Sequence, residues 1–189
     1  MTKPKVTSDA RHRILKAADR LFYQEGIRAV GIDRIIAQAG VAKMSLYNHF
    51  QSKDDLILAV LVHREQVVMA FFEERVIRHQ KKMKNPIKAF FAALRDWFET
   101  PLFRGCAFIN ASVELAHDHA GFAFARDHKE RFRQFLKELV QQAVGRAASA
   151  VTPAIFLLVE GAIVAAVMQG RPDSADVARD AALRLAKQS

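Results

Sequence analysis

The residues best suited to chemistry in this chain lie just before position 54, and their types favour contact with nucleic acid. The stretch 43–53 carries amines, hydroxyls, two amides and an imidazole. Such groups donate hydrogen bonds to phosphate oxygens and to base edges in the major groove of DNA. The residues that helical spacing turns outwards here are Lys43, Ser45, Tyr47, Asn48 and His49.

A helix-turn-helix is predicted to position these side chains. Residues 32–39 carry apolar side chains on one helical face, and Gly40 stands where a left-handed residue commonly ends a helix. A second helix is predicted over 43–50, where Leu46 and Phe50 are four apart and share the inner face. The remaining side chains of this second helix can therefore point into a groove of DNA.

A further helix is predicted to begin directly after this motif. Ser52 is a helix-capping residue type, and the acidic residues Asp54 and Asp55 follow in the first turn. The amides at such a helix start, together with Lys53, make a site for an anion such as phosphate.

The distribution of charge agrees with a polyanionic partner. Residues 1–53 hold 10 lysines and arginines against 4 acidic residues, whereas residues 54–189 hold 19 against 16. The basic excess is therefore densest around the helix-turn-helix, as expected of a DNA-binding surface. Basic surfaces are common, so the position of this charge carries more weight than its amount.

Cysteine content and hydropathy favour a cytoplasmic protein. The single cysteine excludes an intrachain disulfide and fits a reducing compartment. The first residues lack the apolar stretch of a secretory signal. The most apolar segment, residues 154–168, is interrupted by Glu160 and is short for a membrane span, which favours a buried helix or a subunit interface.

Helical periodicity runs through the whole sequence, and no alternating strand pattern competes with it. The expected fold class is all-α, with an N-terminal three-helix helix-turn-helix domain, residues 1–53, joined to a larger C-terminal helical bundle, residues 54–189. About nine helices are predicted, over residues 7–25, 32–39, 43–50, 54–83, 87–99, 105–117, 122–147, 154–169 and 174–187.

Glycine, aromatic, basic and capping residues between positions 10 and 60 fall in one recognisable register. They are Phe22, Gly26, Ile35, Ala39, Gly40, Val41, Lys43, Ser45, Leu46, Tyr47, His49, Phe50, Ser52 and Lys53. In these residues the chain resembles the TetR (tetracycline-repressor-like) family of transcriptional regulators. Two positions depart from the family pattern, because Gly31 stands where a capping threonine is common and Met44 where a small residue is common.

The resemblance implies a ligand-responsive homodimer that binds double-stranded DNA. Residues 1–53 would bind DNA, and residues 54–189 would bind a ligand and dimerise. Each subunit would place one helix in a major groove, and the ligand would change the separation of the two DNA-binding domains. The expected function is that of a repressor released from a palindromic operator by a small hydrophobic effector.

The resemblance also implies roles for individual residues. Ser45, Tyr47 and Lys53 would contact phosphates. A half-buried packing role is the alternative for Tyr47, and His49 is as well suited to capping or packing as to a phosphate contact. The residues nearest the bases would be Lys43, Met44 and Asn48.

Aromatic residues are concentrated later in the chain, where 12 of the 14 phenylalanines follow residue 70. They suit a cavity for a small hydrophobic or aromatic effector, although an ordinary core is the alternative for each of them. Asn110 and Glu114 are one turn apart on one predicted helix and would supply orienting polar groups, and Cys106, one turn before Asn110, would share their face. The expected ligand-binding residues are Trp97, Cys106, Phe108, Asn110 and Glu114.

Cys106 has two interpretations. At a predicted helix start beside Arg104, its thiol would be activated as in a sensor of electrophiles or oxidants. A small, inert, buried apolar residue is the alternative, and we favour it.

The helices 154–169 and 174–187 are predicted to form the dimer interface. Gly161, Ala162, Ala165 and Ala166 are small enough for close helix approach, and an exposed apolar helix is unfavourable in a monomer. An internal core helix is the alternative, because buried helices look the same by periodicity.

Two other classes of function are alternatives to a ligand-responsive regulator. An architectural DNA-binding protein without an effector would keep the DNA-binding motif and have a filled core. An enzyme is not expected, because Cys106 has no nucleophile elbow, metal signature or phosphate loop to support it. His117 and His119 face apart on a helix, so no metal is predicted, and no cofactor is expected.

Overall fold

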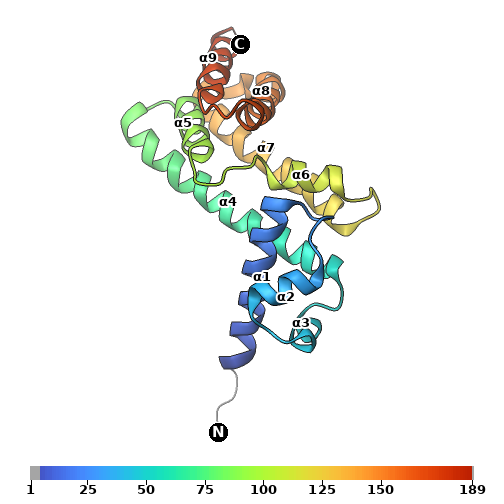
Figure 1. Cartoon of the computed structure of the whole chain (residues 1–189). Coiled ribbons are helices and arrows are strands. Elements are labelled where there is room, and N and C mark those ends of the chain that lie inside the picture. The colour runs from blue at the N-terminus through green and yellow to red at the C-terminus, as the bar shows by residue number, and fades with distance from the viewer. Residues whose placement is uncertain (1–4, 189) are drawn as a thin grey trace. The chain divides into compact units, whose positions relative to one another are not determined.

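The computed structural model describes the backbone of residues 5–188 and the side chains of residues 9–188. These residues form nine α-helices and one short 3-10 turn, with no strand among them (Figure 1), which confirms the all-α prediction. The helices are α1 (Lys5–Glu25), α2 (Ile32–Ala39), α3 (Lys43–His49), α4 (Lys53–Met83), α5 (Pro86–Phe98), α6 (Ala107–Glu114), α7 (Ala120–Val144), α8 (Ala148–Gln169) and α9 (Ser174–Lys187). The outer limits of the two predicted domains, residues 1 and 189, lie outside the described residues.

The chain folds into two compact units that do not follow a single cut in the sequence. Within the described residues, the first is made by the chain up to Gln66 together with Ala107–Asp127, and the second by Val67–Cys106 together with the chain from His128 onwards. The long helices α4 and α7 each contribute to both units. The helix-turn-helix and α6 therefore belong to the same unit, although more than fifty residues separate them in the sequence.

α2 and α3 form the predicted helix-turn-helix, and α1 packs against both of them (Figure 1). Gly40 ends α2 in the predicted left-handed conformation, with φ 62° and ψ 45°. The guanidinium of Arg13 on α1 donates to the carbonyl oxygens of Ala39 at 3.2 Å and Gly40 at 3.0 Å. Carbonyls at a helix end have no partner within the helix, so this contact joins α1 to the turn of the motif.

α4 begins with the serine cap that the sequence predicts. The hydroxyl of Ser52 accepts a hydrogen bond from the backbone N–H of Asp55 at 3.0 Å, as a capping residue does. Leu46 and Phe50 are both buried, which confirms the predicted inner face of α3.

Three helices of the later chain, α6, α7 and α8, differ by more than one residue from their predicted limits. α6 begins at Ala107 rather than at 105, because Gly105 has a positive φ of 79° and cannot continue a right-handed helix. α7 begins at Ala120, two residues before its predicted start. The ring Nδ1 of His119 accepts the N–H of Gly121 at 2.8 Å and so caps the new first turn. At its other end α7 stops at Val144, because Gly145 has a φ of 64°.

α8 is longer than predicted, since it starts at Ala148 rather than at 154. Pro153 lies inside its first two turns, where a proline removes only a bond close to the helix start. The hydroxyl of Thr152 donates to the carbonyl of Ala148 at 2.7 Å, so one carbonyl of this first turn has a side-chain partner.

The core of the second unit is aromatic. Phe72 on α4 lies against Phe90 on α5 and Phe132 on α7, with ring centroids 5.6 and 5.1 Å away. Trp97 adds an edge contact to Phe72 at 5.7 Å and another to Phe103 at 5.1 Å. Phe72 and Phe90 have no exposed surface, so most of the phenylalanines concentrated here serve as packing residues.

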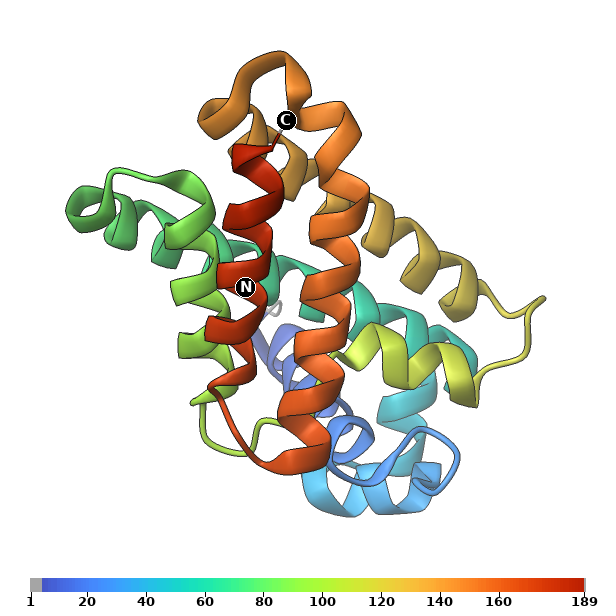
Figure 2. The same cartoon turned by 90° about the horizontal axis from the view of Figure 1, so that it is seen from above.

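α9 lies between α5 and α8 in the second unit (Figure 2). Arg95 of α5 hydrogen-bonds to Glu99, the residue that follows this helix, and to Asp176 of α9, and these carboxylates raise the pKa of Arg95 above its ordinary value. On α7, the hydrogen bond from Arg133 lowers the pKa of the Glu130 carboxyl. The pair Arg95–Asp176 joins α5 to α9, whereas the pair Arg133–Glu130 lies within α7.

α8 contains the most apolar part of the chain. By length and composition, the continuous stretch Ala120–Gln169, which includes α8, is apolar enough to cross a membrane, with a mean hydropathy of 2.2 in its most apolar window. α8 nevertheless packs against α9, and its Glu160 forms an ion pair with Lys129 of α7. Both features are typical of a helix in the core or subunit interface of a globular protein.

Candidate nucleic-acid interface

The outer face of α3 presents polar side chains on a short, well-anchored helix. Tyr47 is 39% exposed and Met44 is 69% exposed, whereas Leu46 between them is buried in the first unit. The phenol of Tyr47 is therefore available to a ligand. The exposed members of the predicted set are Lys43, Met44, Tyr47 and Asn48, and Ser45 and His49 are half-buried.

Lys53 is fixed at the N-terminus of α4 by two contacts. Its ammonium donates to the carbonyl oxygen of Ile27 at 2.7 Å and lies 5.9 Å from the centre of the Phe22 ring. An ammonium has three N–H bonds, and the contact with Ile27 uses one of them. Lys53 is thus held beside the start of a helix, where anions are favoured.

Lys43 makes a much looser contact. Its ammonium lies 3.4 Å from a carboxylate oxygen of Asp33, and both side chains are well exposed. An exposed pair of this kind contributes little, about 0–1 kcal/mol, so Lys43 can leave Asp33 for a stronger acceptor.

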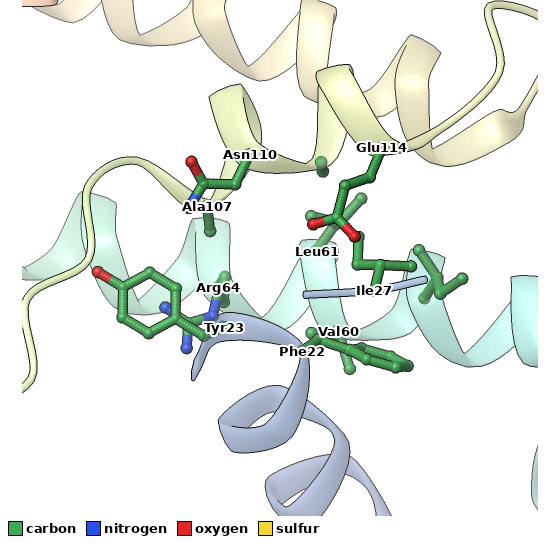
Figure 3. A pocket seen from close by; sticks show the side chains of 11 residues that line it. Phe22, Tyr23, Ile27, Val60, Leu61, Arg64, Ala107, Asn110 and Glu114 are labelled. Atoms are coloured by element: carbon green, nitrogen blue, oxygen red, sulfur yellow. The ribbon is translucent and has the colours of Figure 1, made fainter. Parts of the chain in front are cut away.

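A small pocket lies inside the first unit, between α1, α4 and α6 (Figure 3). The side chains of Asn110 and Glu114 reach into it from α6, and Tyr23 and Arg64 line it from the opposite side. Its volume is about 20 Å³. That space holds about one water molecule, so this pocket as it stands does not admit a ten-atom effector.

Arg64 is held in place at the edge of this pocket. Its guanidinium lies 2.5 Å from a carboxylate oxygen of Asp19 and 3.8 Å from the centre of the Tyr23 ring. The pocket wall therefore combines an ion pair with a cation–π contact, and α1 and α4 are joined through it.

The structure brings together only some of the predicted ligand-binding residues. Asn110 and Glu114 line one pocket, which confirms that they share a helix face. Phe108 is buried in the same unit, 6.5 Å from the ring of Phe124. Trp97 lies instead in the aromatic core of the second unit, and Cys106 is buried in that unit as well.

One part of the prediction for Cys106 is wrong. Cys106 precedes α6, so the helical spacing that placed it on the same face as Asn110 does not apply to it. The reason lies next to it, because the left-handed Gly105 prevents the helix from starting at the predicted position.

Sequence reasoning missed the contact between α6 and the turn that joins α1 to α2. The carboxylate of Glu114 accepts the backbone N–H of Arg28 at 2.9 Å, and the guanidinium Nε of Arg28 donates to the carbonyl oxygen of Glu114 at 2.5 Å. These residues are 86 positions apart, and no local signal in the sequence relates them.

Comparison with known proteins gives matches over both parts of the chain. Residues 14–60 match the sequence profile described as bacterial regulatory proteins, tetR family. Residues 84–182 match the profile described as tetracyclin repressor-like, C-terminal domain. The second match alone covers more than half of the chain.

The curated relatives include both a transcriptional activator and a transcriptional repressor. The chain is 35% identical over 86 residues to the HTH-type transcriptional activator FasR of Mycolicibacterium smegmatis, an alignment that covers 44% of this chain and 39% of that protein. It is 29% identical over 124 residues to the HTH-type transcriptional repressor ComR of Escherichia coli, covering 64% of this chain and 57% of ComR. The chain therefore spans less than two thirds of the length of these relatives.

A solved structure agrees over nearly the full length. SCO4454, a TetR-family transcriptional regulator from Streptomyces coelicolor, is 32% identical with a TM-score of 0.84, and the alignment covers 96% of each chain. The reduced form of Escherichia coli NemR, at 19% identity and a TM-score of 0.75 over 94% of this chain and 97% of NemR, shares the fold.

Proposed function

Because the chain belongs to the TetR family of bacterial transcriptional regulators, we propose that it binds a specific operator through α3 and the first turn of α4. It is a DNA-binding regulator and not an enzyme. The observation that carries the proposal is the exposed polar face of α3, with Lys53 held beside it at the start of α4. Its side chains are an amine, a phenol and an amide on one rigid support, which suits a major groove.

Each side chain has a role in this proposal. Ser45, Tyr47 and Lys53 contact phosphates and fix the register of the protein on DNA. His49 is half-buried, which suits the packing role as well as a phosphate contact. Lys43, Met44 and Asn48 lie nearest the base edges and select the sequence.

The proposal includes a palindromic operator, because a single short helix spans too few bases for useful specificity. Selection from random duplexes by the purified protein should return a sequence with two related half-sites. Bound sequences that share no repeated half-site would contradict this part of the proposal.

Dimerisation through residues 154–187 is the second part of the proposal. α8 exposes Leu157, Gly161, Val164 and Met168, which are spaced four, three and four apart like the contact stripe of a helix pair. Leu157 is 71% and Met168 80% exposed, a costly arrangement in an isolated protomer. The position where a Cβ of Gly161 would lie is open, so a partner helix can approach closely there.

The third part is an effector, which we propose to be a small hydrophobic or aromatic compound. The pocket of the first unit combines apolar side chains, such as Ile57 and Val60, with the polar side chains of Asn110 and Glu114, a lining that suits such a compound. Binding must favour one dimer geometry over another for DNA affinity to change. Trp97 is the only tryptophan, so its fluorescence reports on compounds that enter the second unit.

A second candidate function is an architectural DNA-binding protein without an effector. The volume of about 20 Å³ between α1, α4 and α6 favours it, since that space is too small for a ligand. Titration of a library of aromatic compounds separates the two candidates. Release of operator DNA together with a change in Trp97 fluorescence supports the effector, whereas DNA affinity that no compound changes supports the architectural protein.

We propose that the regulator acts in the cytoplasm as a repressor. A dimer on its operator blocks polymerase by occupying the promoter. A reporter driven by a promoter that contains the selected operator should fall in expression when the protein is produced. A rise in expression would assign it to the activators instead.

A further inference from the structure

A single peptide unit in the α1–α2 turn lies between two charged side chains. Its carbonyl oxygen, from Ile27, accepts a hydrogen bond from the ammonium of Lys53 at 2.7 Å. Its N–H, from Arg28, donates to the carboxylate of Glu114 at 2.9 Å. The end of α6 is thus joined to the first residue of α4 through one peptide, within the first unit.

The turn is shaped to receive this carboxylate. Gly26 has a φ of 96°, a conformation that residues with a side chain rarely adopt. A Cβ at Gly26 would lie 3.1 and 3.3 Å from the two carboxylate oxygens of Glu114. Figure 3 shows Glu114 extending from α6 towards Ile27 on this turn. The close approach of carboxylate and backbone therefore depends on a glycine.

The contact affects Lys53 in two ways. The peptide is planar and stiff, so fixing its N–H end also fixes the direction of its carbonyl. A carboxylate on the N–H also polarises the peptide and makes the carbonyl of Ile27 a stronger acceptor for Lys53. The lysine consequently loses part of its rotamer freedom before DNA arrives, which favours binding.

We propose that Glu114 is a positioning residue for DNA binding, which holds Lys53 ready for a phosphate through the Ile27–Arg28 peptide. This inference rests on the proposed phosphate contact of Lys53. It gives α6 a direct route to the DNA-binding surface, because withdrawal of Glu114 from the turn frees the lysine.

The test measures the affinity of the full-length protein for its selected operator by fluorescence anisotropy at fixed salt. Glu114→Ala removes the acceptor and should weaken binding about fivefold, the effect of losing roughly one hydrogen bond. Glu114→Gln keeps an acceptor oxygen at the same reach and should stay within about twofold of the original protein. Asp118→Asn is the matched control, because it removes an exposed carboxylate four residues further on and should have no effect.

A double-substitution cycle separates positioning from a general loss of structure. In a Lys53→Met background, Glu114→Ala should cause no further loss of affinity, since its effect passes through the ammonium. An equal loss in both backgrounds, or no loss in the original background, would overturn the inference. If Glu114→Ala does not fold, Glu114→Asp replaces it. Its carboxylate is one methylene too short to reach Arg28, so wild-type affinity of that variant would also overturn the inference.

Failure of the underlying proposal has a different signature. Lys53→Met by itself should weaken binding and reduce the slope of log affinity against log salt by about one. An unchanged affinity and slope in Lys53→Met would remove the phosphate contact itself, whatever the Glu114 variants do.

Discussion

Both carboxylate oxygens of Glu160 accept hydrogen bonds from the ammonium of Lys129, each at 2.8 Å. The two side chains are 23% and 20% exposed, and Glu160 is the one charged residue of α8. The lysine therefore neutralises the only carboxylate on a helix whose other side chains are uncharged and mostly apolar. Without this partner the charge would be left in poorly hydrated surroundings.

Removing the lysine alone should destabilise the protein. For Lys129→Met we expect a loss of about 2 kcal/mol in the free energy of unfolding, because Glu160 is left without its partner. The double variant Lys129→Met with Glu160→Leu should recover most of this loss, since no charge remains to be desolvated. Urea denaturation of the three proteins measures both effects. A double variant no more stable than Lys129→Met would argue against an electrostatic origin.

Loss of a phosphate contact should weaken DNA binding without changing its sequence preference. Lys53→Ala and Tyr47→Phe are both expected to lower affinity for operator and for unrelated duplexes by similar factors. Removing one hydrogen bond with Tyr47→Phe should cost about 1 kcal/mol, or roughly fivefold in affinity. Gel-shift titrations at fixed salt on both duplexes make the measurement.

Asn48→Ala is the comparison for that experiment, because Asn48 is assigned to the bases. It should reduce affinity for the operator more than for unrelated DNA, by about 1–3 kcal/mol at the contacted base pair. Equal losses on all duplexes from Asn48→Ala would remove its assignment to base contact.

Enlarging Gly161 should prevent dimerisation without harming the protomer. Gly161 lies on the exposed stripe of α8, and no atom lies within 4 Å of the position of its Cβ. In Gly161→Leu the side chain has room in the protomer, and leucine favours a helix by about 0.8 kcal/mol over glycine. In the dimer the same side chain would separate the two helices. Sedimentation should show a monomer at micromolar concentration.

Val113→Leu serves as the control for the dimer, since Val113 is also exposed but lies on α6. It should sediment as the unsubstituted protein does. A dimer in Gly161→Leu with undiminished affinity would place the interface elsewhere.

Two glycines of the helix-turn-helix should respond in opposite directions to substitution. Gly40 has a φ of 62°, so Gly40→Ala should lower stability by about 1 kcal/mol through backbone strain. Gly31 caps α2 with an extended φ of −85° and gives no side-chain hydrogen bond. Gly31→Ser adds such a bond and should raise stability by a few tenths of a kcal/mol. Thermal unfolding of the two variants provides the measurement, and a stabilised Gly40→Ala would contradict the strain argument.

Local signals in the sequence were enough to predict the helix-turn-helix. Gly40 and Ser52 act on the backbone within a few residues of themselves, so their effects on α2 and α4 follow from residue type alone. The spacing of Leu46 and Phe50 likewise determines which face of α3 is buried. The outward set of candidate DNA contacts could therefore be predicted from the sequence.

The proposed dimer face on α8 could be predicted only in part from the sequence. The small residues of α8 were predicted to allow a partner helix to approach closely, and in the structure they are divided between two faces. Ala162 and Ala166 are buried inside the protomer, whereas Gly161 and Val164 belong to the exposed stripe. α8 is apolar on every side, so its sequence pattern could not tell which face meets α9 and which stays open.

The sequence by itself determined the helical fold, the helix-turn-helix and the family, because each depends on patterns that repeat or act within a few residues. Only the tertiary structure decided that Glu114 meets the turn at Arg28, 86 residues away, and that Trp97 lies in a different unit from Asn110. Such contacts depend on how whole helices pack, and packing is set by the summed shapes and apolar surfaces of many side chains. No short segment contains that information, so the contact of Glu114 with the turn between α1 and α2 could not be predicted from the sequence.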